Sequence, residues 1–367
     1  MPQSFRTERI EEPALQGSAP LHCSASLRNG VPPPLQSGVG AYAPCVQCPR
    51  KCAADRKIAR GLCGEGDALR IASACLHFGE EPPVTVFGGS GTIFFTGCTL
   101  RCAFCQNYQI SQNGMGRAVD RTEFVKICRT LEDAGAENIN LVTGSHAIPL
   151  IASYLKSARE EGVSIPFCWN SSAYESVETL ELLEDLVSVW LPDLKTLSPE
   201  LAKHLFGAEN YPEAAALAVR WMIDRFPLSL VQKTKGGTEK EKIERGVIVR
   251  HLFLPGRFSE TADTLAWLKR YADGKALVSL MSQYTPVPFE KSERVKREAA
   301  LSAIENRLVS EAEDTDLRDL IDAYGFEYLF YQELSDDTSW LPDFNRTQPF
   351  SNALAKPVWH WKTGFAV

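Results

Sequence analysis

From residue 91 onward, short apolar segments alternate with longer amphipathic segments. The apolar segments are uninterrupted by charge over most of their length, which is typical of strands buried on both faces of a parallel sheet. We predict strands at Thr92–Thr96, Ile139–Thr143, Pro166–Asn170, Val187–Leu191, Val247–Leu254 and Ala276–Met281. A later helix at Leu317–Tyr324 and a strand at Glu327–Tyr331 are expected to extend the sheet.

The clearest helix is predicted at Asp120–Ala134. Asp120 and Glu123 have the spacing of a capping box, one face is apolar, and Gly135 follows as a stop. A strand followed by a helix, repeated about six times, predicts parallel strands joined by right-handed crossovers. We therefore expect an α/β fold built as an incomplete (β/α) barrel, with an open doubly wound sheet as the alternative. In both folds ligands bind at the C-terminal ends of the strands.

The same pattern suggests boundaries between four parts of the chain. Residues 1–41 are expected to be a poorly ordered leader, and residues 42–90 a small Cys-rich metal-binding region. The barrel should occupy residues 91–335, and residues 336–367 would form a C-terminal tail.

Charge and composition narrow the class of protein. The net charge of −7 argues against a nucleic-acid partner, because a phosphate backbone requires a surplus of Lys and Arg. The mixed-charge run Lys233–Arg245 is interpreted as a solvated loop. No apolar run is long enough to cross a bilayer, and the first twenty residues lack the apolar core of a secretory signal. We expect a cytoplasmic protein without membrane partners.

The eleven cysteines carry the chemistry. Close-spaced thiols in a chain expected to occupy a reducing compartment indicate metal ligands or redox groups rather than a disulfide framework. Cys98, Cys102 and Cys105 directly follow the first predicted strand with the spacing C-x3-C-x2-C. Thiolates bind iron–sulfur clusters or zinc, and a closed zinc site needs four ligands. Three ligands on a cubane cluster leave one iron open; the alternative is a zinc site completed by a distant residue.

This loop, including the aromatic Phe104 before the third cysteine, resembles the signature of the radical S-adenosylmethionine (SAM) superfamily. The longer string from Gly89 through Tyr108 is similar to the PflX-like group, which is related to pyruvate formate-lyase activating enzymes. Other similar strings are Cys45-Val46-Gln47-Cys48-Pro49-Arg50, His77-Phe78-Gly79-Glu80-Glu81-Pro82 and Ser282-Gln283-Tyr284-Thr285-Pro286.

The resemblance implies a partial TIM-type (β/α)6 radical SAM barrel, with a [4Fe-4S] cluster and SAM as cofactors. It implies an oxidoreductase that cleaves SAM reductively to a 5′-deoxyadenosyl radical and abstracts hydrogen from a substrate. That substrate would be a protein glycyl residue, as for the pyruvate formate-lyase activating enzymes, or another peptide or small molecule. The electron would come from a reductant such as flavodoxin or ferredoxin.

Polar residues stand at three later strand ends. Asp193 and Lys195 follow the fourth predicted strand, and alternate residues of extended chain point to the same side. The resemblance assigns SAM binding to Asp193, Lys195 and Arg250, and we add Asn170 and Phe104 as cofactor contacts.

Many members of the resembled family carry a Gly-Gly-Glu-like turn for the SAM amino group. Thr143-Gly144-Ser145-His146 stands in its place, so carbonyls near Thr143 or the Ser145 and His146 side chains would substitute.

A second set of cysteines lies upstream. Cys45, Cys48, Cys52 and Cys63 have the spacing C-x2-C-x3-C-x10-C, which satisfies a closed site for zinc or for a second iron–sulfur cluster. Two other functions remain open from the residues alone: a non-catalytic iron–sulfur electron carrier, and a zinc-binding interaction protein on a barrel scaffold.

Overall fold

The structure is a computed structural model that describes residues 42–338, 340–351 and 353–366. The predicted leader, residues 1–41, therefore lies outside the described residues. The strands are β1 (Arg70–His77), β2 (Ser90–Phe95), β3 (Arg117–Ala118), β4 (Ile139–Val142), β5 (Phe167–Ser171), β6 (Val189–Pro192), β7 (Ser229–Lys235), β8 (Thr238–Leu252), β9 (Leu277–Met281), β10 (Leu329–Gln332), β11 (Ala355–His360) and β12 (Gly364–Phe365). The helices are α1 (Pro82–Thr85), α2 (Tyr108–Ser111), α3 (Arg121–Asp133), α4 (Ile148–Glu160), α5 (Val177–Leu180), the 3₁₀ helix η2 (Glu181–Leu183), α6 (Pro199–Phe206), α7 (Tyr211–Arg225), α8 (Phe258–Tyr271), α9 (Lys291–Leu301) and α10 (Glu311–Tyr324).

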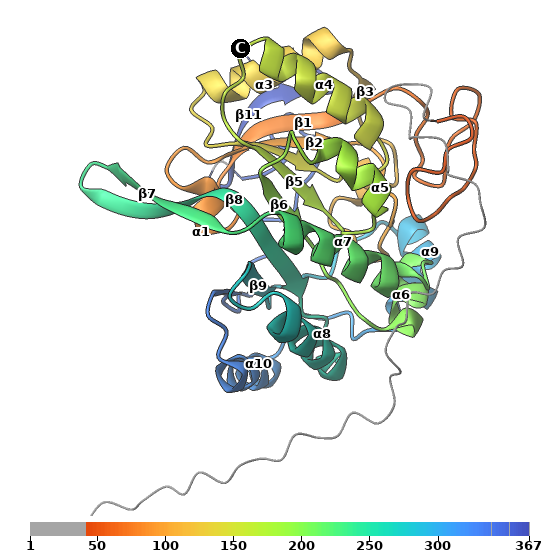
Figure 1. The fold of residues 1–367 in the computed structure, drawn as a ribbon. Helices are drawn as coiled ribbons and strands as arrows, with labels where there is room; N and C mark the ends of the chain where they lie inside the picture. The colour runs from red at the N-terminus through yellow and green to blue at the C-terminus, as the bar shows by residue number, and fades with distance from the viewer. Residues whose placement is uncertain (1–41, 339, 352, 367) are drawn as a thin grey trace, which may run out of the picture. The chain divides into compact units, whose positions relative to one another are not determined.

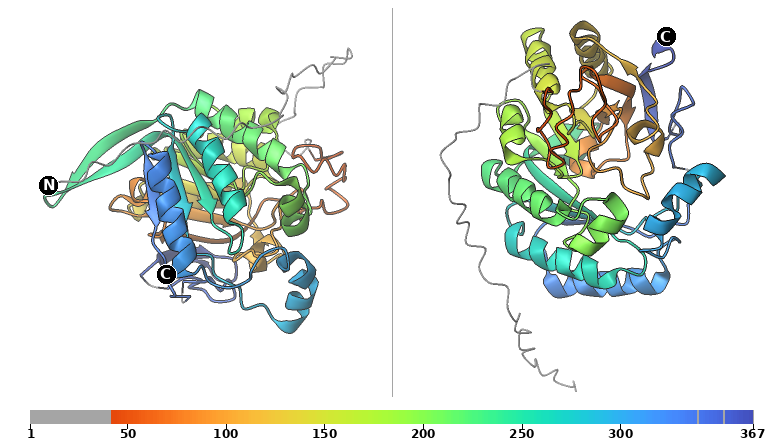
Figure 2. Two further views of the ribbon diagram at one scale, coloured as in Figure 1. Left: turned by 90° about the horizontal axis from the view of Figure 1, so that it is seen from below. Right: turned by 90° about the vertical axis from the view of Figure 1, so that its right-hand side faces the viewer.

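Parallel pairing from β2 to β10 forms the centre of the fold. The order is β2-β4-β5-β6-β8-β9-β10, and each neighbour in this series is parallel to the next. The strands form a curved sheet, and the helices cover its outer face (Figures 1 and 2). The α/β fold and the partial barrel are confirmed. The late helix and strand are also confirmed, since α10 leads into β10, which extends the sheet beyond β9.

Helix α3 forms where the sequence predicts it, with one difference at its start. Asp120 caps the helix by accepting a hydrogen bond from the Glu123 amide at 2.8 Å. The carboxylate of Glu123 does not complete the capping box. It instead accepts hydrogen bonds from Arg117, at 2.8 Å on Oε2, and from the indole of Trp359, at 3.0 Å on Oε1. A long-range contact has therefore replaced the local one.

The mixed-charge run is a β-hairpin rather than a loop, and that prediction was wrong. β7 and the first half of β8 pair antiparallel, and Gly236 and Gly237 form the turn with positive φ at both positions. The hairpin projects from the barrel (Figure 1), and its residues are mostly exposed, as alternating charge predicts. Alternating charge indicates solvent exposure, but it does not distinguish a strand from a loop.

The other end of the sheet is antiparallel. β1 pairs with both β2 and β11, and β11 pairs with β12, so the region predicted as a C-terminal tail contains two strands of the sheet. Trp359 on β11 is fully buried in the main core, and the guanidinium of Arg117 lies 4.7 Å from its ring centroid. No helix in the described ranges is both long and apolar enough to span a bilayer.

Because Trp359 fills the core where the last strands close the sheet, Trp359→Ala should lower the free energy of unfolding by about 3–5 kcal/mol. Trp361, in the same segment, is only half-buried, so Trp361→Ala should cost clearly less. Urea unfolding of both variants measures the difference. Equal losses would show that the C-terminal segment does not contribute to the core as a packed strand.

Candidate functional site

The three predicted cluster ligands lie on one loop at the C-terminal end of β2. Cys98 and Cys102 are buried, Cys105 is partly buried, and all three thiols are free. The Cys98 sulfur accepts a hydrogen bond from the Leu100 amide at 3.3 Å, and the Cys105 sulfur lies 3.3 Å from the Ser111 hydroxyl. Burial raises the pKa of each thiol, because the charged form is poorly solvated. The charge of Lys195 opposes this rise at all three.

Asp193 is the centre of a buried charge network at the neighbouring strand ends. One carboxylate oxygen accepts a hydrogen bond from Arg250 Nε at 2.8 Å and the other accepts from Lys195 Nζ at 2.7 Å. Arg250 also donates to the Asn170 amide oxygen at 2.5 Å. The Tyr211 hydroxyl donates a hydrogen bond to the Asp193 backbone carbonyl and accepts one from the Lys195 backbone amide. Four of the predicted SAM-binding residues therefore meet in one place.

The charges in this network hold one another ionised. Burial alone would lower the pKa of Lys195, but the neighbouring carboxylate of Asp193 outweighs it and raises that pKa. Burial likewise acts to raise the pKa of Asp193, and the two cations, Arg250 first, hold it below its usual value. The site therefore keeps separate positive and negative groups at neutral pH.

Two acidic residues in this network were missed by sequence reasoning. Glu80 accepts hydrogen bonds from Arg250 at 3.3 Å and from Asn140 at 3.1 Å, and burial raises its pKa against the effect of Arg250. Burial raises the pKa of Glu81 in the same way, again against Arg250. Both precede α1, in a segment that follows the antiparallel strand β1. Both residues lie in the string His77–Pro82, which resembles the same family but to which no function was assigned. That string was the feature of the sequence from which they could have been found.

The turn after β4 has an acidic partner that the sequence did not indicate. Thr143 adopts a positive φ of 62°, and Ser145 donates a hydrogen bond to Glu175 Oε1 at 2.5 Å. The indole of Trp169 reaches the same oxygen at 3.3 Å. Glu175 is buried, which raises its pKa, and the charge of Asp193 adds to that rise. Burial lowers the pKa of His146 to about 3, so its imidazole is neutral.

Phe104 lies in an aromatic cluster beneath the loop. Its ring packs edge-on against Phe206 at 6.2 Å and against Tyr284 at 5.9 Å between centroids. It is almost fully buried, and the Ala103 amide beside it donates to the Leu205 carbonyl at 2.8 Å. The structure therefore places Phe104 as packing that connects the cysteine loop to α6.

The upstream cysteines lie against this loop. The Cys98 amide donates to the Cys63 carbonyl at 3.2 Å, and Arg50 donates to the Thr99 carbonyl at 2.9 Å. Arg56 donates to the His146 carbonyl at 2.6 Å, and its guanidinium lies 4.2 Å from the ring centroid of Tyr42. The Cys-rich segment, residues 42–66, is thereby joined to the cysteine loop and to the turn after β4. Figure 2 shows it as the orange-red coil at the C-terminal ends of the strands.

The four upstream thiols differ in their environment. Cys45, Cys48 and Cys63 are buried, and burial raises the pKa of Cys48 to about 12. Cys52 is half-buried; burial acts to raise its pKa, but backbone hydrogen bonds from Ala54 and Leu62 outweigh burial and lower it. Within the ranges that the structure describes, no three or more His, Cys, Asp or Glu side chains form a group that could hold a metal ion, and the thiols are free.

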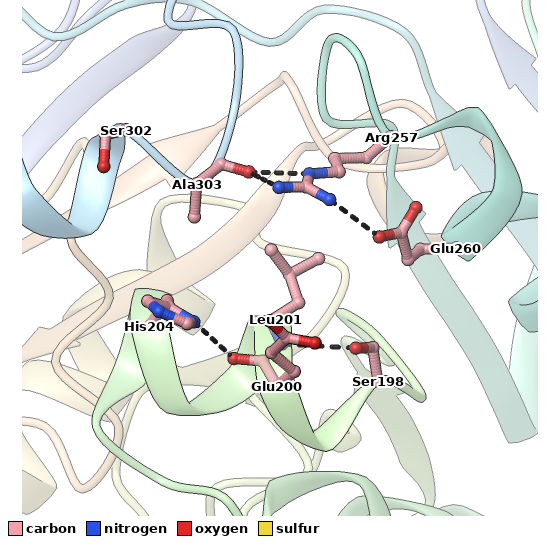
Figure 3. Close-up of a pocket in the computed structure, with 8 residues that line it drawn as sticks. All are labelled: Ser198, Glu200, Leu201, His204, Arg257, Glu260, Ser302 and Ala303. Carbon is pink, nitrogen blue, oxygen red and sulfur yellow. Dashed lines mark hydrogen bonds and ion pairs between the residues drawn. The ribbon is translucent and has the colours of Figure 1, made fainter.

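A separate hollow of about 270 Å³ opens between α6, the start of α8 and the end of α9 (Figure 3). Two of its charged groups are paired with each other, since Arg257 bonds Glu260 at 3.1 Å, and Arg257 also donates to the Ala303 carbonyl at 2.6 Å. None of the predicted site residues lines it. Its lining is Ser198, Glu200, Leu201, His204, Arg257, Glu260, Ser302 and Ala303.

Gly97 makes the junction between the two cysteine regions testable. It has φ +86°, and a Cβ there would overlap Glu65 Cγ and lie 3.1 Å from the Cys63 carbonyl oxygen. Gly135 has a similar φ of +90° but open space around it, so Gly135→Ala is a matched control for backbone strain. Both variants should lose about 1–2 kcal/mol from strain. Gly97→Ala should also loosen residues 42–66, measured as faster proteolysis of that segment; equal proteolysis in both variants would contradict the close junction.

Comparison with known proteins shows what the chain is similar to. Residues 92–232 match the model of the Radical SAM superfamily. Over 250 residues the chain is 29% identical to an uncharacterized protein of Methanocaldococcus jannaschii, and the alignment covers 66% of each chain. Streptococcus suis SuiB bound to S-adenosylmethionine overlaps with a TM-score of 0.45 at 13% identity, over 64% of this chain and 48% of SuiB. A domain of pyruvate-formate lyase-activating enzyme from Bacteroides vulgatus overlaps with a TM-score of 0.34 at 12% identity, over 51% of this chain and 91% of that domain.

The chain thus spans about half the length of SuiB and about two thirds of the archaeal relative. The matched stretch begins in β2 and ends in β7, and it contains the three-cysteine loop, Asn170, Asp193 and Lys195. Arg250, Glu80 and the upstream cysteines lie outside it. The similarity to the Radical SAM superfamily therefore covers residues 92–232.

Proposed function

We propose that this chain is a radical SAM enzyme in which Cys98, Cys102 and Cys105 hold a [4Fe-4S] cluster. The observation that carries the proposal is the contact path from the Asp193–Lys195 pair to the cysteine loop. The Tyr211 hydroxyl bonds the backbone of both residues, its ring lies 5.1 Å from that of Phe206, and Phe206 lies 6.2 Å from Phe104 of the loop. A set of ligands for iron and a set of charges for an amino acid therefore meet at one edge of the sheet.

The donor chemistry fits the cluster. Three free thiols come from one loop, and on a cubane each thiolate binds a different iron, so the sulfurs need not crowd around one ion. Lys195 supplies a positive charge that favours thiolates. When bound, the cluster supplies one electron to the sulfonium of SAM, which releases a 5′-deoxyadenosyl radical.

The strand-end network fits the amino acid part of SAM. A lysine ammonium has three N–H donors, and in the described residues Lys195 gives one to Asp193. The other donors would receive the SAM carboxylate. Both oxygens of Asp193 are occupied by cations, so Asp193 would act by positioning Lys195 and Arg250. Asn170 and Glu80 hold Arg250 from its other side.

For the SAM amino group we propose Ser145 and Glu175. This pair lies on the turn after β4 and the segment after β5, where the sequence departs from the Gly-Gly-Glu-like pattern. A buried carboxylate with a raised pKa gains most from a cation beside it, because the cation replaces lost hydration. An ammonium group supplies that cation.

The finer parts of the proposal rest on the sequence motifs. Cys45, Cys48, Cys52 and Cys63 would bind a second metal, either zinc or an iron–sulfur cluster. The substrate would be a protein glycyl residue, as for the pyruvate formate-lyase activating enzymes. A different peptide or a small molecule is the alternative, and its test is the product formed from cell extract with SAM and reductant.

Cys98→Ala should abolish SAM cleavage and cluster retention while the fold remains. Anaerobically reconstituted protein should carry about four irons for this cluster and form 5′-deoxyadenosine under dithionite. Cys128→Ala is the control, because Cys128 is also a buried free thiol but belongs to α3 and not to the cysteine loop. Iron analysis, circular dichroism and chromatography of 5′-deoxyadenosine provide the readouts. Formation of 5′-deoxyadenosine by Cys98→Ala, or none by intact iron-loaded wild type, would refute the proposal.

Lys195→Met should weaken SAM binding about 10- to 100-fold, since a hydrogen bond to a charged group contributes about 1.5–3 kcal/mol. Lys203→Met is the matched control, because Lys203 is an exposed residue of α6 whose ion pair with Glu209 is at the surface. Binding is measured as the change in the cluster's electron paramagnetic resonance signal during SAM titration. An unchanged affinity in Lys195→Met would remove Lys195 from the site.

A further inference from the structure

The Cys-rich segment presents an exposed surface that is both apolar and basic. Ile58 is 86% exposed, Leu62 58% and Val46 47%, all high for large apolar side chains. The cations Lys51, Lys57 and Arg60 are exposed in the same short segment. We call these six residues the basic surface: Val46, Lys51, Lys57, Ile58, Arg60 and Leu62.

The charge of this segment is opposite to that of the chain. Residues 42–66 contain five Lys or Arg and two Asp or Glu, which gives +3, whereas the whole chain carries −7. Of the two acids, Glu65 is buried and paired with Arg70, and Asp55 accepts a hydrogen bond from the Lys57 amide. The field at the basic surface is therefore positive against a negative background.

The basic surface is only a few atoms away from the thiols. Gly61 lies between the exposed Arg60 and Leu62, and a Cβ on Gly61 would stand 3.2 Å from the Cys63 sulfur and 3.6 Å from the Cys52 sulfur. The Cys63 carbonyl in turn accepts the hydrogen bond from Cys98. A continuous backbone path thus joins the exposed side chains to the first cysteine of the three-cysteine loop.

The segment is held firmly enough to act as a docking platform. Arg50 donates to the carbonyls of Thr99 and Phe206 at 2.9 and 2.7 Å. The Gln47 carbonyl accepts from the hydroxyls of Ser176 at 2.9 Å and Thr179 at 2.5 Å. Arg50 and the Gln47 carbonyl are thereby bonded to the barrel, while the apolar side chains of the basic surface are exposed.

We propose that the basic surface docks an acidic one-electron donor protein of the flavodoxin or ferredoxin class. This inference rests on the proposed function, because the electron it delivers reduces the cluster on the Cys98–Cys105 loop. The balance is simple: the donor's cofactor is oxidised by one electron and the cluster is reduced by one. Exposed apolar side chains that are interleaved along the segment with exposed cations suit a transient partner with an acidic surface, in which charge steers association and apolar contact orients it.

The test compares two double variants of the full chain. The first is Lys57→Glu with Ile58→Ser, on the basic surface. The control is Lys235→Glu with Leu217→Ser, which makes the same kinds of change at the exposed hairpin end and on α7. Rates of 5′-deoxyadenosine formation are measured with dithionite and, separately, with reduced flavodoxin at a series of concentrations. Flavodoxin binding is measured directly at about 50 mM and about 300 mM salt.

In the first variant the KM for flavodoxin should rise about tenfold or more, because charge reversal removes electrostatic steering, while the dithionite rate stays as in wild type. The control should match wild type with both reductants, and flavodoxin binding to wild type should weaken with salt. An unchanged KM and affinity for flavodoxin in the first variant would overturn the docking proposal. An equal fall in the dithionite and flavodoxin rates would also overturn it. So would binding of a short RNA to the basic surface that leaves flavodoxin binding intact. If wild type with an intact cluster is inactive even with dithionite, the proposed function fails, and the binding measurement still decides the docking surface.

Discussion

The arrangement of the site depends on Asp193, which holds one cation on each carboxylate oxygen. Removing a single partner from such a buried network leaves an uncompensated charge, which costs about 3–5 kcal/mol. The network draws together β5, β6 and β8 with the segment before α1, since Asn170, Arg250 and Glu80 all join it. It therefore sets how these strand ends stand relative to one another and to the cysteine loop.

The Cys-rich segment depends on the barrel for its position. Few of its side chains belong to the main core, Tyr42 and Cys45 among them, and its polar groups bond carbonyls of the cysteine loop, of α6 and of the turn after β4. Backbone carbonyls are obligatory hydrogen-bonding groups, so a barrel that lacked this segment would expose several acceptors at its ligand-binding edge. The segment and the site are therefore joined by hydrogen bonds into one structural unit. A metal bound in the segment would lie next to a cluster on the three-cysteine loop.

Burial has opposite consequences for different groups at this edge. It raises the pKa of the cysteine thiols and of Glu80, Glu81 and Glu175, and it keeps His146 neutral. At Asp193 and Lys195, whose partners of opposite charge lie at 2.7 and 2.8 Å, pairing outweighs desolvation, whereas at Glu80 the longer contact with Arg250, at 3.3 Å, does not. The edge is thus ready to receive positive charge, which both iron and a sulfonium compound carry.

The sequence by itself determined the parallel strands of the barrel, their order along the chain, and the three-cysteine loop, because each is encoded within a few neighbouring residues by periodicity or spacing. It also placed Asp193 and Lys195 at a strand end, since two residues apart in an extended chain share a side. Only the tertiary structure decided that Glu80 reaches Arg250 from 170 positions away, that Glu123 bonds Trp359 instead of completing its own capping box, and that Cys63 lies against Cys98. Such contacts depend on how distant elements pack, and no local pattern carries that information.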